Sequence, residues 1–296
     1  MSTSTSRRSV FITGCSAGGI GSAIAYEYQR LGYHVLVSAR NPSKISSELA
    51  SLPNVTTIQL DVCSEQSIDS AVKEVSKVAG GKLDVLINNA GSSLTCPALD
   101  TSLEDARQQF ELHFIAPLAC TKAFLLLLVR GHNPVVANNS SIAGETNLPF
   151  QAVYGASKSA TATFSETLRL EVEPLGIRVV TVITGIIETN LHNNEKEQEL
   201  PEESFYAPLN QWLRERKVGT NRPPGMPVDQ YAKQCVAKIE KGARGKIYVG
   251  PLTPPFVYLR WWCPQWVWDI FMVKAGPKNQ NEVIANEYRR KMQFRD

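Results

Sequence analysis

Short runs of apolar residues alternate along the chain with longer segments that are apolar on one side only. The short runs predict strands at Ser9–Thr13, His34–Ser38, Val55–Leu60, Asp84–Ile87, Val135–Asn138, Arg178–Ile183 and Lys246–Val249. The longer segments predict helices at Gly21–Leu31, Ser64–Val78, Leu103–Val129 and Ala152–Glu173. Apolar strands that alternate with helices are typical of a parallel sheet covered on both faces. We therefore expect an α/β fold with a single doubly wound parallel sheet of about seven strands, which binds its ligand at the carboxyl ends of the strands.

Length and composition narrow the possible functions. The 296 residues contain no repeat and no low-complexity linker, so we expect one domain at 1–255 and a C-terminal extension at 256–296. The net charge of +3 is small and its Lys and Arg residues are scattered, which gives no indication of a nucleic-acid partner. The six cysteines lie far apart without a CxxC pair, so we expect neither a metal site nor a disulfide framework. This pattern and a polar N-terminus without a signal-like apolar core favour an intracellular, reducing compartment.

Glycines cluster directly after the first predicted strand, in the sequence Thr13-Gly14-Cys15-Ser16-Ala17-Gly18-Gly19-Ile20-Gly21. Such a loop lets the backbone approach a pyrophosphate, and the helix after it offers free N–H groups and the positive end of its dipole. A glycine-rich turn without a ligand is the alternative. The strand before the loop and the helix after it favour nucleotide binding in a Rossmann-type sheet. The candidate cofactor-binding residues here are Gly14, Ser16, Gly19, Ile20 and Gly21.

The end of the second predicted strand bears on the choice of cofactor. A site that prefers NAD usually has an acidic residue there, whereas this chain has Arg40. The planar guanidinium of Arg40 can pair with a 2′-phosphate, so NADP(H) is the favoured cofactor, although a solvated surface arginine is the alternative. Asp61, after the third strand, can accept a hydrogen bond from adenine. Asn89, Ala90 and Gly91, after the fourth strand, are expected to close over the cofactor.

Tyr154 and Lys158 are four residues apart on a predicted helix and therefore share one face. A nearby ammonium favours the phenolate and lowers the tyrosine pKa, so that the hydroxyl can exchange a proton with a substrate oxygen near neutral pH. Ser141, just past the fifth strand, can hold a substrate carbonyl oxygen. By itself, the spacing of Tyr154 and Lys158 is more often that of a surface pair. Its position after a nucleotide loop favours the catalytic interpretation.

These segments together resemble the short-chain dehydrogenase/reductase family over roughly residues 9–250. The matching pieces are the glycine loop, Asn88-Asn89-Ala90-Gly91, Ser141 and Tyr154-Gly155-Ala156-Ser157-Lys158. The resemblance implies that Ser141 polarises a carbonyl, that Tyr154 is the general acid/base, and that Lys158 lowers the Tyr154 pKa and bonds the nicotinamide ribose. It also implies that Thr189, shortly after Ile187, contacts the nicotinamide amide; both are cofactor-binding candidates. The family commonly forms dimers or tetramers, so a homo-oligomer is expected.

The chain departs from the family pattern in three places. The glycine loop is one residue longer than usual, with four residues between Gly14 and Gly19. Thr184 stands where the family usually has a proline. The family's fourth catalytic residue is an asparagine in the middle of the long fourth helix, and the matching residue here is His113. A histidine can donate and accept, so His113 is a candidate for the proton relay. The alternative is a satisfied core residue.

Within the family, the chain is most similar to the acyl-dihydroxyacetone-phosphate reductases and their fungal relatives. The similarity is carried by Ile183-Thr184-Gly185, Ala207–Arg216, 226–233 and the aromatic C-terminal segment. It implies NADPH-dependent reduction of a hydrophobic ketone, either an acyl-dihydroxyacetone-phosphate-like lipid or a ketone of fungal secondary metabolism. A catalytically weak NADP(H)-binding sensor or scaffold is the alternative. Residues 190–230 are expected to cover the substrate.

The segment 256–273 reads FVYLRWWCPQWVWDIFMV and holds four of the five tryptophans. Its polar residues make it a poor membrane span, but tryptophan favours the membrane–water boundary. An interfacial anchor on a membrane or lipid droplet is therefore expected, with a cytoplasmic or peripheral endoplasmic-reticulum location. A lid over the substrate pocket and a dimer contact are the alternatives.

Overall fold

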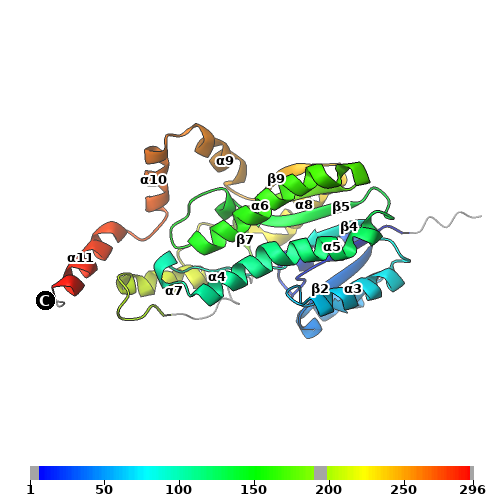
Figure 1. Cartoon of the computed structure of the whole chain (residues 1–296), viewed down its shortest axis with the longest axis horizontal. Helices are drawn as coiled ribbons and strands as arrows, with labels where there is room; N and C mark the ends of the chain where they lie inside the picture. Colours follow the sequence, from blue (N-terminus) through cyan, green and yellow to red (C-terminus); the bar gives the residue numbers. More distant parts are fainter. Residues whose placement is uncertain (1–6, 190–198, 294–296) are drawn as a thin grey trace, which may run out of the picture.

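Parallel strands form the centre of the computed structural model, which describes residues 7–189 and 199–293 (Figure 1). Within these residues, the seven-stranded sheet has the order β3-β2-β1-β4-β5-β6-β9, so the predicted doubly wound parallel sheet is confirmed. Because every strand pairs in parallel, the loops that follow the strands gather at one edge of the sheet. Residues 1–6, 190–198 and 294–296 lie outside the description, and with them most of the polar N-terminus and part of the predicted substrate cover.

Each predicted strand has a counterpart at or next to its expected position. The strands are β1 (Ser9–Ile12), β2 (His34–Ala39), β3 (Val55–Gln59), β4 (Val85–Asn88), β5 (Val135–Ser141), β6 (Arg178–Thr184) and β9 (Gly245–Val249). Strand β5 continues beyond its predicted end at Asn138 and reaches Ser141. A second, two-stranded sheet of β7 (Ile187–Glu188) and β8 (Met226–Pro227) is not among the predicted elements, because strands this short show no hydrophobic period.

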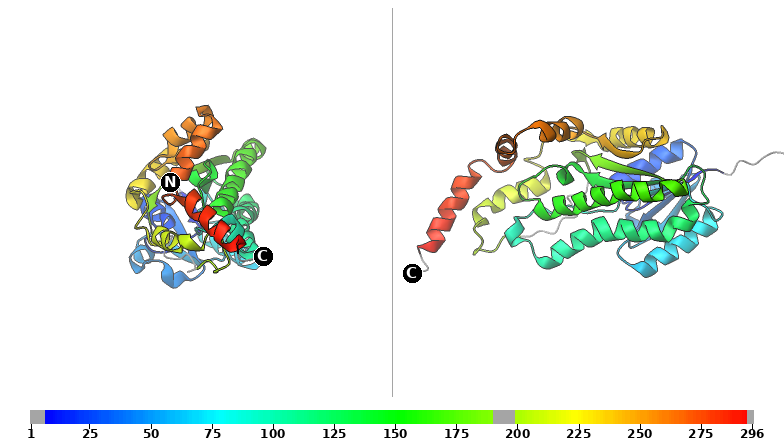
Figure 2. Two further views of the ribbon diagram at one scale, coloured as in Figure 1. Left: turned by 90° about the vertical axis from the view of Figure 1, so that its left-hand side faces the viewer. Right: turned by 45° about the horizontal axis from the view of Figure 1, so that its top comes forward.

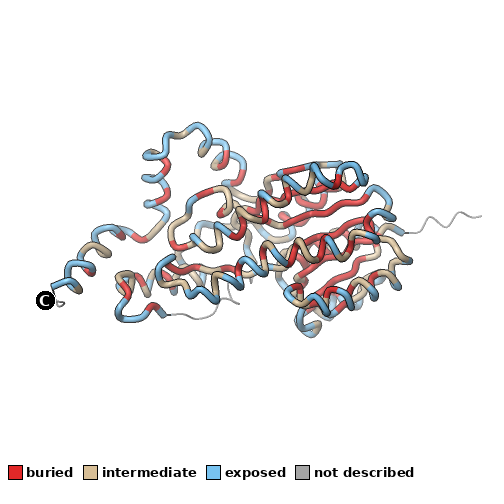
Figure 3. The backbone as a smooth tube through the Cα atoms, viewed as in Figure 1, coloured by how far each residue is buried: buried red, intermediate tan, exposed pale blue. Residues whose placement is uncertain are grey.

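Helices cover both faces of the sheet, as expected. One face carries α1 (Ile20–Arg30), α2 (Ser47–Ser51) and α8 (Val228–Glu240). The other carries α3 (Glu65–Val78), α5 (Ala116–Leu128) and α6 (Ala152–Val172), which lie in front of the sheet in Figure 1. Successive strand residues point to opposite layers. Val10 and Ile12 of β1 pack towards α1, whereas Phe11 stacks on Phe124 of α5, with ring centroids 4.8 Å apart. The strands other than the edge strand β3 are consequently buried along most of their length (Figure 3).

The predicted helix Leu103–Val129 contains a change of helical pitch. A π-helical turn, Glu111–Ile115, separates α4 (Leu103–Phe110) from α5. Pro117 gives the physical reason. In an α-helix, the backbone N–H at position 117 would bond the carbonyl of His113, but proline has no backbone N–H. The turn is wider instead, with the Ala116 N–H donating to the Glu111 carbonyl. By length and composition, 103–128 is also the one stretch in the described part of the chain that could cross a membrane, but α5 belongs to the core against the sheet.

The C-terminal helices α9 (Thr253–Trp262), α10 (Gln265–Lys274) and α11 (Gln280–Met292) extend beyond the end of the sheet (Figure 2). Trp268 is fully buried within this segment, where its ring lies 5.9 Å from that of Phe256. In contrast, Trp261, Trp262 and Trp266 are 80%, 88% and 69% exposed. The aromatic segment therefore has an inner side, which holds its own helices together, and an outer side. The division into 1–255 and 256–296 stays a prediction.

Helix α11 returns to the body of the protein at a small hydrophobic cluster next to α7 (Asn210–Val218). This cap cluster comprises Cys96, Phe150, Leu200, Leu209 and Leu213, with Leu94, Tyr206, Trp212, Val283 and Ile284 packed around them. The Lys291 ammonium donates to the Ser204 carbonyl, at 2.9 Å, which adds a polar contact. The described part of the predicted substrate cover is thus partly held by the C-terminal helix.

Candidate functional site

The glycine loop after β1 packs directly on the loop after β4. Gly14 has a φ of +74°, and a Cβ there would lie 2.7 Å from the Ala90 Cα. A Cβ on Gly21 would lie 2.6 Å from the Asn89 Nδ2. Since real Cβ atoms do not approach other atoms so closely, both positions require glycine. The structure therefore brings together four of the predicted cofactor-binding residues.

Hydrogen bonds fix the same two loops to each other. The backbone N–H groups of Asn89 and Ala90 both donate to the Thr13 Oγ1, each at 3.0 Å. The Asn89 side-chain amide donates to the carbonyls of Thr13, at 2.9 Å, and Gly14, at 3.1 Å. Gly91, the next predicted residue, is exposed at the end of this segment. The floor of the site is thus a preformed, rigid piece of backbone.

The N-terminus of α1 lies at the end of the glycine loop. Gly19 is the N-cap residue, it carries no side chain to cap the helix, and its N–H bonds the Ser16 carbonyl at 3.1 Å. The N–H groups of the first turn, which begins at Ile20, are therefore left for a ligand, and the helix dipole favours an anion. Within the same loop, the Ala17 N–H donates to the Lys44 carbonyl, at 2.8 Å.

Arg40 and Asp61 lie at the ends of two neighbouring strands, β2 and β3. Arg40 is exposed and makes no ion pair with another of the described residues. Asp61 is half-buried, and its Oδ1 accepts from the Cys63 N–H at 3.1 Å, which holds the carboxylate in the loop. Arg40 follows β2, which is the neighbour of β1 in the sheet, and Asp61 follows β3, one strand further out. That these residues meet the adenosine end of a dinucleotide stays a prediction.

Lys158 is buried on α6, one turn after the half-buried Tyr154. Its Nζ lies 6.0 Å from the centroid of the Tyr154 ring and donates to the Asn139 carbonyl at 2.9 Å. Burial lowers the pKa of Lys158 from 10.5 to about 7, because a charged ammonium is poorly solvated there. An amine held in this way changes its charge near neutral pH and lies where that charge acts on the Tyr154 phenol.

Ser141 is the last residue of β5, and the turn after it is pressed against α6. A Cβ on Gly144 would lie 2.8 Å from the backbone of Lys158, and a Cβ on Gly155 would lie 2.8 Å from the Ala143 carbonyl oxygen. The hydroxyl of Ser140 adds a bond to the Lys158 carbonyl at 2.8 Å. Close backbone packing therefore holds the Ser141 turn against the part of α6 that carries Tyr154 and Lys158.

Asn139 and Thr184 form a connection that the sequence interpretation misses. The Asn139 amide donates to the Asn89 Oδ1 at 3.1 Å, and the Thr184 hydroxyl donates to the Asn139 Oδ1 at 2.6 Å. The Thr184 hydroxyl also lies 2.7 Å from that of Tyr231, which must then donate to it. Thr184 thus ties β6 to β5 and α8, a bond that a proline at this position could not make. The available signal was the polar run Asn138–Ser141 at the end of a buried strand.

His113 lies in the π-helical turn and is 1% exposed. Its Nδ1 is 2.8 Å from the Ser157 Oγ, and its Nε2 accepts from the Ser92 N–H at 3.2 Å. The ring meets that of Tyr154 edge to face, with centroids 5.5 Å apart. The structure therefore places His113 beside the predicted catalytic pair, with both ring nitrogens engaged.

Ile187 lies in β7, and Thr189 follows this strand directly. Both are half-buried, and the described chain stops at Thr189 before it resumes at residue 199.

Phe150, in the turn before α6, has a φ of +64°, which is unusual for a bulky residue. Its ring packs against Trp212 of α7, with centroids 5.4 Å apart. An apolar wall therefore lies next to the helix turn that carries Tyr154.

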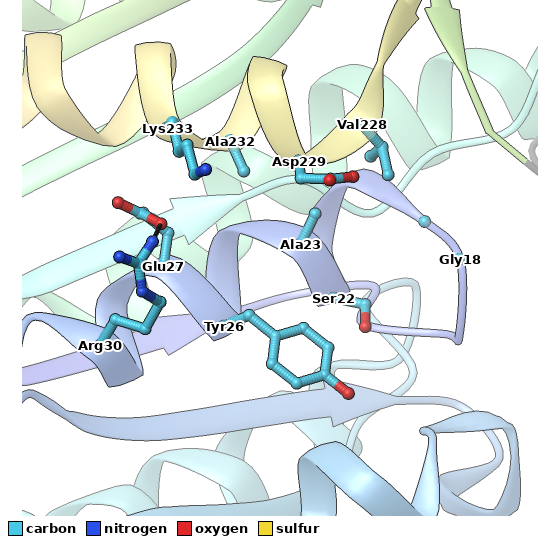
Figure 4. A pocket seen from close by; sticks show the side chains of 11 residues that line it. Gly18, Ser22, Ala23, Tyr26, Glu27, Arg30, Val228, Asp229, Ala232 and Lys233 are labelled. Atoms are coloured by element: carbon cyan, nitrogen blue, oxygen red, sulfur yellow. Dashed lines mark hydrogen bonds and ion pairs between the residues drawn. The ribbon is translucent and has the colours of Figure 1, made fainter.

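A separate groove of about 320 Å³ lies between α1 and α8 (Figure 4). Its walls include Tyr26, Arg30, Asp229 and Lys233, and it reaches the glycine loop at Gly18 and Gly19. None of Ser141, Tyr154 and Lys158 lines it. This groove is therefore distinct from the predicted catalytic residues.

Known proteins share both the sequence pattern and the fold. A family model described as short chain dehydrogenase matches residues 8–200. The short-chain dehydrogenase ptmH of Penicillium ochrochloron is 36% identical over 270 residues, which cover 91% of this chain and 98% of that protein. The NADPH-dependent 1-acyldihydroxyacetone phosphate reductase of Schizosaccharomyces pombe is 32% identical over 271 residues, which cover 90% and 87% of the two chains. A crystal structure of a short-chain dehydrogenase from Streptomyces avermitilis has a TM-score of 0.73 at 26% identity, with 100% of both chains covered.

Proposed function

We propose that this chain, which belongs to the short-chain dehydrogenase/reductase family of oxidoreductases, reduces a hydrophobic ketone to a secondary alcohol with NADPH as reductant. The observation that carries the proposal is the buried Lys158, which lies on the same face of α6 as Tyr154. The Asn139 carbonyl accepts a hydrogen bond from its ammonium. A buried amine that pairs with no carboxylate among the described residues costs stability, so its presence needs a functional reason. Proton transfer at Tyr154 supplies that reason.

The residues around the glycine loop fit a dinucleotide. Gly14 and Gly21 leave no room for a side chain, and the first turn of α1 has free N–H groups for a pyrophosphate. The exposed Arg40 favours a 2′-phosphate and hence NADP(H), as does the NADPH dependence in the name of the S. pombe relative. When bound, the reduced nicotinamide supplies the hydride for the carbonyl carbon.

The protein's own residues would hold and protonate the carbonyl oxygen. In this proposal Ser141 donates a hydrogen bond to that oxygen and Tyr154 gives it the proton, which balances the hydride added to carbon. The charged form of Lys158 stabilises the phenolate that remains on Tyr154. Asn139 keeps Lys158 in place and is itself tied to the cofactor loop through Asn89. The oxidation of an alcohol uses the same groups in reverse.

The apolar wall beside α6 supports a hydrophobic substrate. Phe150, Tyr206 and Trp212 gather there, together with apolar residues of α7 and α11. Two substrate classes are proposed for this surface: an acyl-dihydroxyacetone-phosphate-like lipid, as in the name of the S. pombe relative, and a ketone of fungal secondary metabolism. Supplying both classes to the purified protein and following NADPH absorbance distinguishes them.

Replacing Tyr154 with Phe tests the proposed reaction. The variant removes only the hydroxyl, so NADPH-dependent ketone reduction should fall by at least about 100-fold because general acid catalysis is lost. NADPH affinity, measured by fluorescence titration, should change less than about threefold because the ring remains. Tyr26→Phe is the matched control, because Tyr26 lies in the groove between α1 and α8.

A normal turnover of the Tyr154→Phe variant would contradict the assignment. The alternative function, a sensor or scaffold that binds NADP(H) without turnover, predicts a different result: tight NADPH binding by the parent protein and no NADPH oxidation with either substrate class. Such a result would replace the proposed activity with the binding function.

The exposed tryptophans of α9 and α10 support a peripheral association with a membrane or lipid droplet. Trp261, Trp262 and Trp266 point outward, whereas Trp268 and Met272 are buried and hold the helices together. Lys274 and Lys278 follow them and favour an anionic lipid surface. We therefore propose an intracellular enzyme that is cytoplasmic or lies peripherally on the endoplasmic reticulum or a lipid droplet.

The replacement Trp261→Ser/Trp262→Ser/Trp266→Ser tests this association without removing the packed residues of the tail. Co-sedimentation with phosphatidylcholine vesicles that contain phosphatidylserine should weaken by at least about tenfold, because three interfacial aromatic side chains are lost. The control Leu99→Ser/Val218→Ser removes two apolar side chains that are 82% and 73% exposed and lie outside the C-terminal helices. It should leave the co-sedimentation with vesicles unchanged. Undiminished sedimentation would refute the proposal, and a change from oligomer to monomer would assign the tryptophans to a subunit contact instead.

A homo-oligomer is proposed on the strength of the family. Leu103 of α4 and Leu126 of α5 are 72% and 66% exposed, and Leu170 of α6 is 60% exposed. Leu126 and Leu170 lie on helices that cover one face of the sheet, and Leu103 lies on α4, which leads into α5. A second copy of the chain can bury such exposed apolar positions. Light scattering of the purified protein measures the number of subunits directly.

A further inference from the structure

We infer that His113 is a positioning residue, locked with its proton on Nδ1, which ties the loop after β4 to the turn of α6 that carries Tyr154. This inference rests on the proposed function for its effect on catalysis, but not for the state of the ring. In this inference His113 is not a proton relay. It is one member of a directed chain of hydrogen bonds, in which its single ring proton is already donated to Ser157.

Two independent bonds determine the tautomer. The Ser92 N–H can only donate, so the Nε2 that lies 3.2 Å from it must be unprotonated. The Ser157 hydroxyl has one proton and gives it to the Tyr154 carbonyl at 2.7 Å, so it must accept from His113. The Nδ1, 2.8 Å from the Ser157 Oγ, therefore carries the proton. The bonds run in one direction, from Ser92 through His113 and Ser157 to the Tyr154 backbone.

The charge state of the ring agrees with this arrangement. Burial lowers the pKa of His113 well below its usual value, and the neighbouring Lys158 lowers it further. A second ring proton would also point from Nε2 at the Ser92 N–H and break that bond. His113 therefore stays neutral over the pH range in which a solvent-exposed histidine titrates.

The segment after β4 is clamped by two residues of one helix face. Gln109 lies one turn before His113, and its amide donates to the Ser92 Oγ at 2.9 Å. His113 holds the N–H of the same serine. Gly91 allows the close approach, because a Cβ there would lie 3.2 Å from the His113 Nε2 and 3.6 Å from the Lys158 Nζ. Movement of the helix at His113 would thus move the backbone next to the proposed cofactor site.

The π-helical turn is what carries His113 to α6. Pro117 leaves the His113 carbonyl without its helical donor, and the Thr161 hydroxyl bonds that carbonyl at 2.6 Å. His113 is therefore attached to α6 through its backbone as well as through its ring. The edge-to-face contact with Tyr154 completes the arrangement, since it restricts the plane of the phenol.

Nitrogen-15 NMR of the histidine ring tests the tautomer without reference to activity. In protein labelled on histidine, with His113 assigned by its loss in His113→Phe, Nδ1 should show the shift of a protonated nitrogen and Nε2 that of an unprotonated one. This pattern should persist from about pH 8 to about pH 5, the range in which exposed histidines titrate. A proton on Nε2, or titration of the ring within this range, would overturn the inference.

Kinetics test the positioning role. His113→Phe keeps an aromatic ring against Tyr154 but loses both bonds, so kcat should fall about 10- to 100-fold through misplacement of the reacting groups. The pH dependence of kcat should keep its shape, because no titrating group has been removed. His113→Asn retains one donor and one acceptor and should keep more activity than His113→Phe. His132→Phe, which removes an exposed histidine, is the control.

Ser157→Ala provides a second variant that leaves the buried ring in place. If His113 acts through Ser157, the double variant His113→Phe/Ser157→Ala should be no slower than His113→Phe alone, because both changes break the same chain. Additive losses, an altered pH profile, or full activity of His113→Phe would each refute the positioning role. A parent protein that reduces no ketone would instead refute the proposed function, and the NMR result would then decide the inference on the tautomer.

Discussion

Lys158 should destabilise the protein at neutral pH, and Lys158→Met should expose this cost. The pKa falls from 10.5 to about 7 on folding, so the unfolded chain binds the proton more tightly than the folded one. A shift of this size corresponds to about 5 kcal/mol of penalty, at about 1.4 kcal/mol for each pKa unit. The penalty is fully present below pH 7 and is relieved as the pH rises towards 10.5, where the unfolded lysine also loses its proton.

The comparison between two pH values removes the other effects of the substitution. Lys158→Met also leaves the Asn139 carbonyl without its donor, but this loss is the same at every pH. Between about pH 7 and about pH 9, the free energy of unfolding of the parent should rise by about 2 kcal/mol more than that of the variant. Urea unfolding of the protein without cofactor, followed by tryptophan fluorescence at both pH values, measures this difference.

Lys73→Met serves as the control, because Lys73 is exposed on α3 and its removal changes the net charge by the same amount. The free energy of unfolding of this control should change with pH as that of the parent does. If Lys158→Met and the parent show the same pH dependence, Lys158 is not held in the buried, desolvated state that the structure gives it, and the physical basis for its role beside Tyr154 is removed.

Two further substitutions test the proposed cofactor site. Arg40→Asp should lower kcat/KM for NADPH by about 10- to 100-fold and leave that for NADH little changed, because a charged hydrogen bond to the 2′-phosphate is replaced by repulsion; an unchanged NADPH-to-NADH ratio would show that Arg40 does not contact the phosphate. Gly21→Ala puts a Cβ 2.5 Å from the Gly14 carbonyl oxygen and 2.6 Å from the Asn89 amide, so the loop must shift and NADPH affinity should fall by at least about tenfold in a fluorescence titration. Gly32→Ala is its control for backbone strain, because Gly32 has a φ of +82° and its added Cβ would meet no atom within 4 Å, away from the glycine loop. This control should keep the NADPH affinity of the parent, and equal affinities of the two variants would contradict the tight packing of the loop.

Much of the fold follows from local sequence patterns. The strands of the main sheet were predictable because each is a short apolar run, and the parallel arrangement followed from the helices between them. The π-helical turn was missed, although Pro117 inside a long apolar helix was its signal. Proline shows that an α-helical bond is lost, but not whether the helix breaks, bends or widens. Here the His113 carbonyl, left without a helical donor, accepts from the Thr161 hydroxyl of α6, a contact with a distant segment that the local sequence does not record.

The sequence by itself determined the family, the order of strands and helices, and which residues are candidates for the site. It could do so because glycine loops, helical spacing and strand ends are local properties of the chain. Only the tertiary structure decided the state of those residues. The burial of Lys158 against Asn139, the bond of Thr184 to Asn139, and the proton position on His113 all depend on atoms from distant segments. Solvation and hydrogen-bond direction are set by these neighbours, and no local pattern records them.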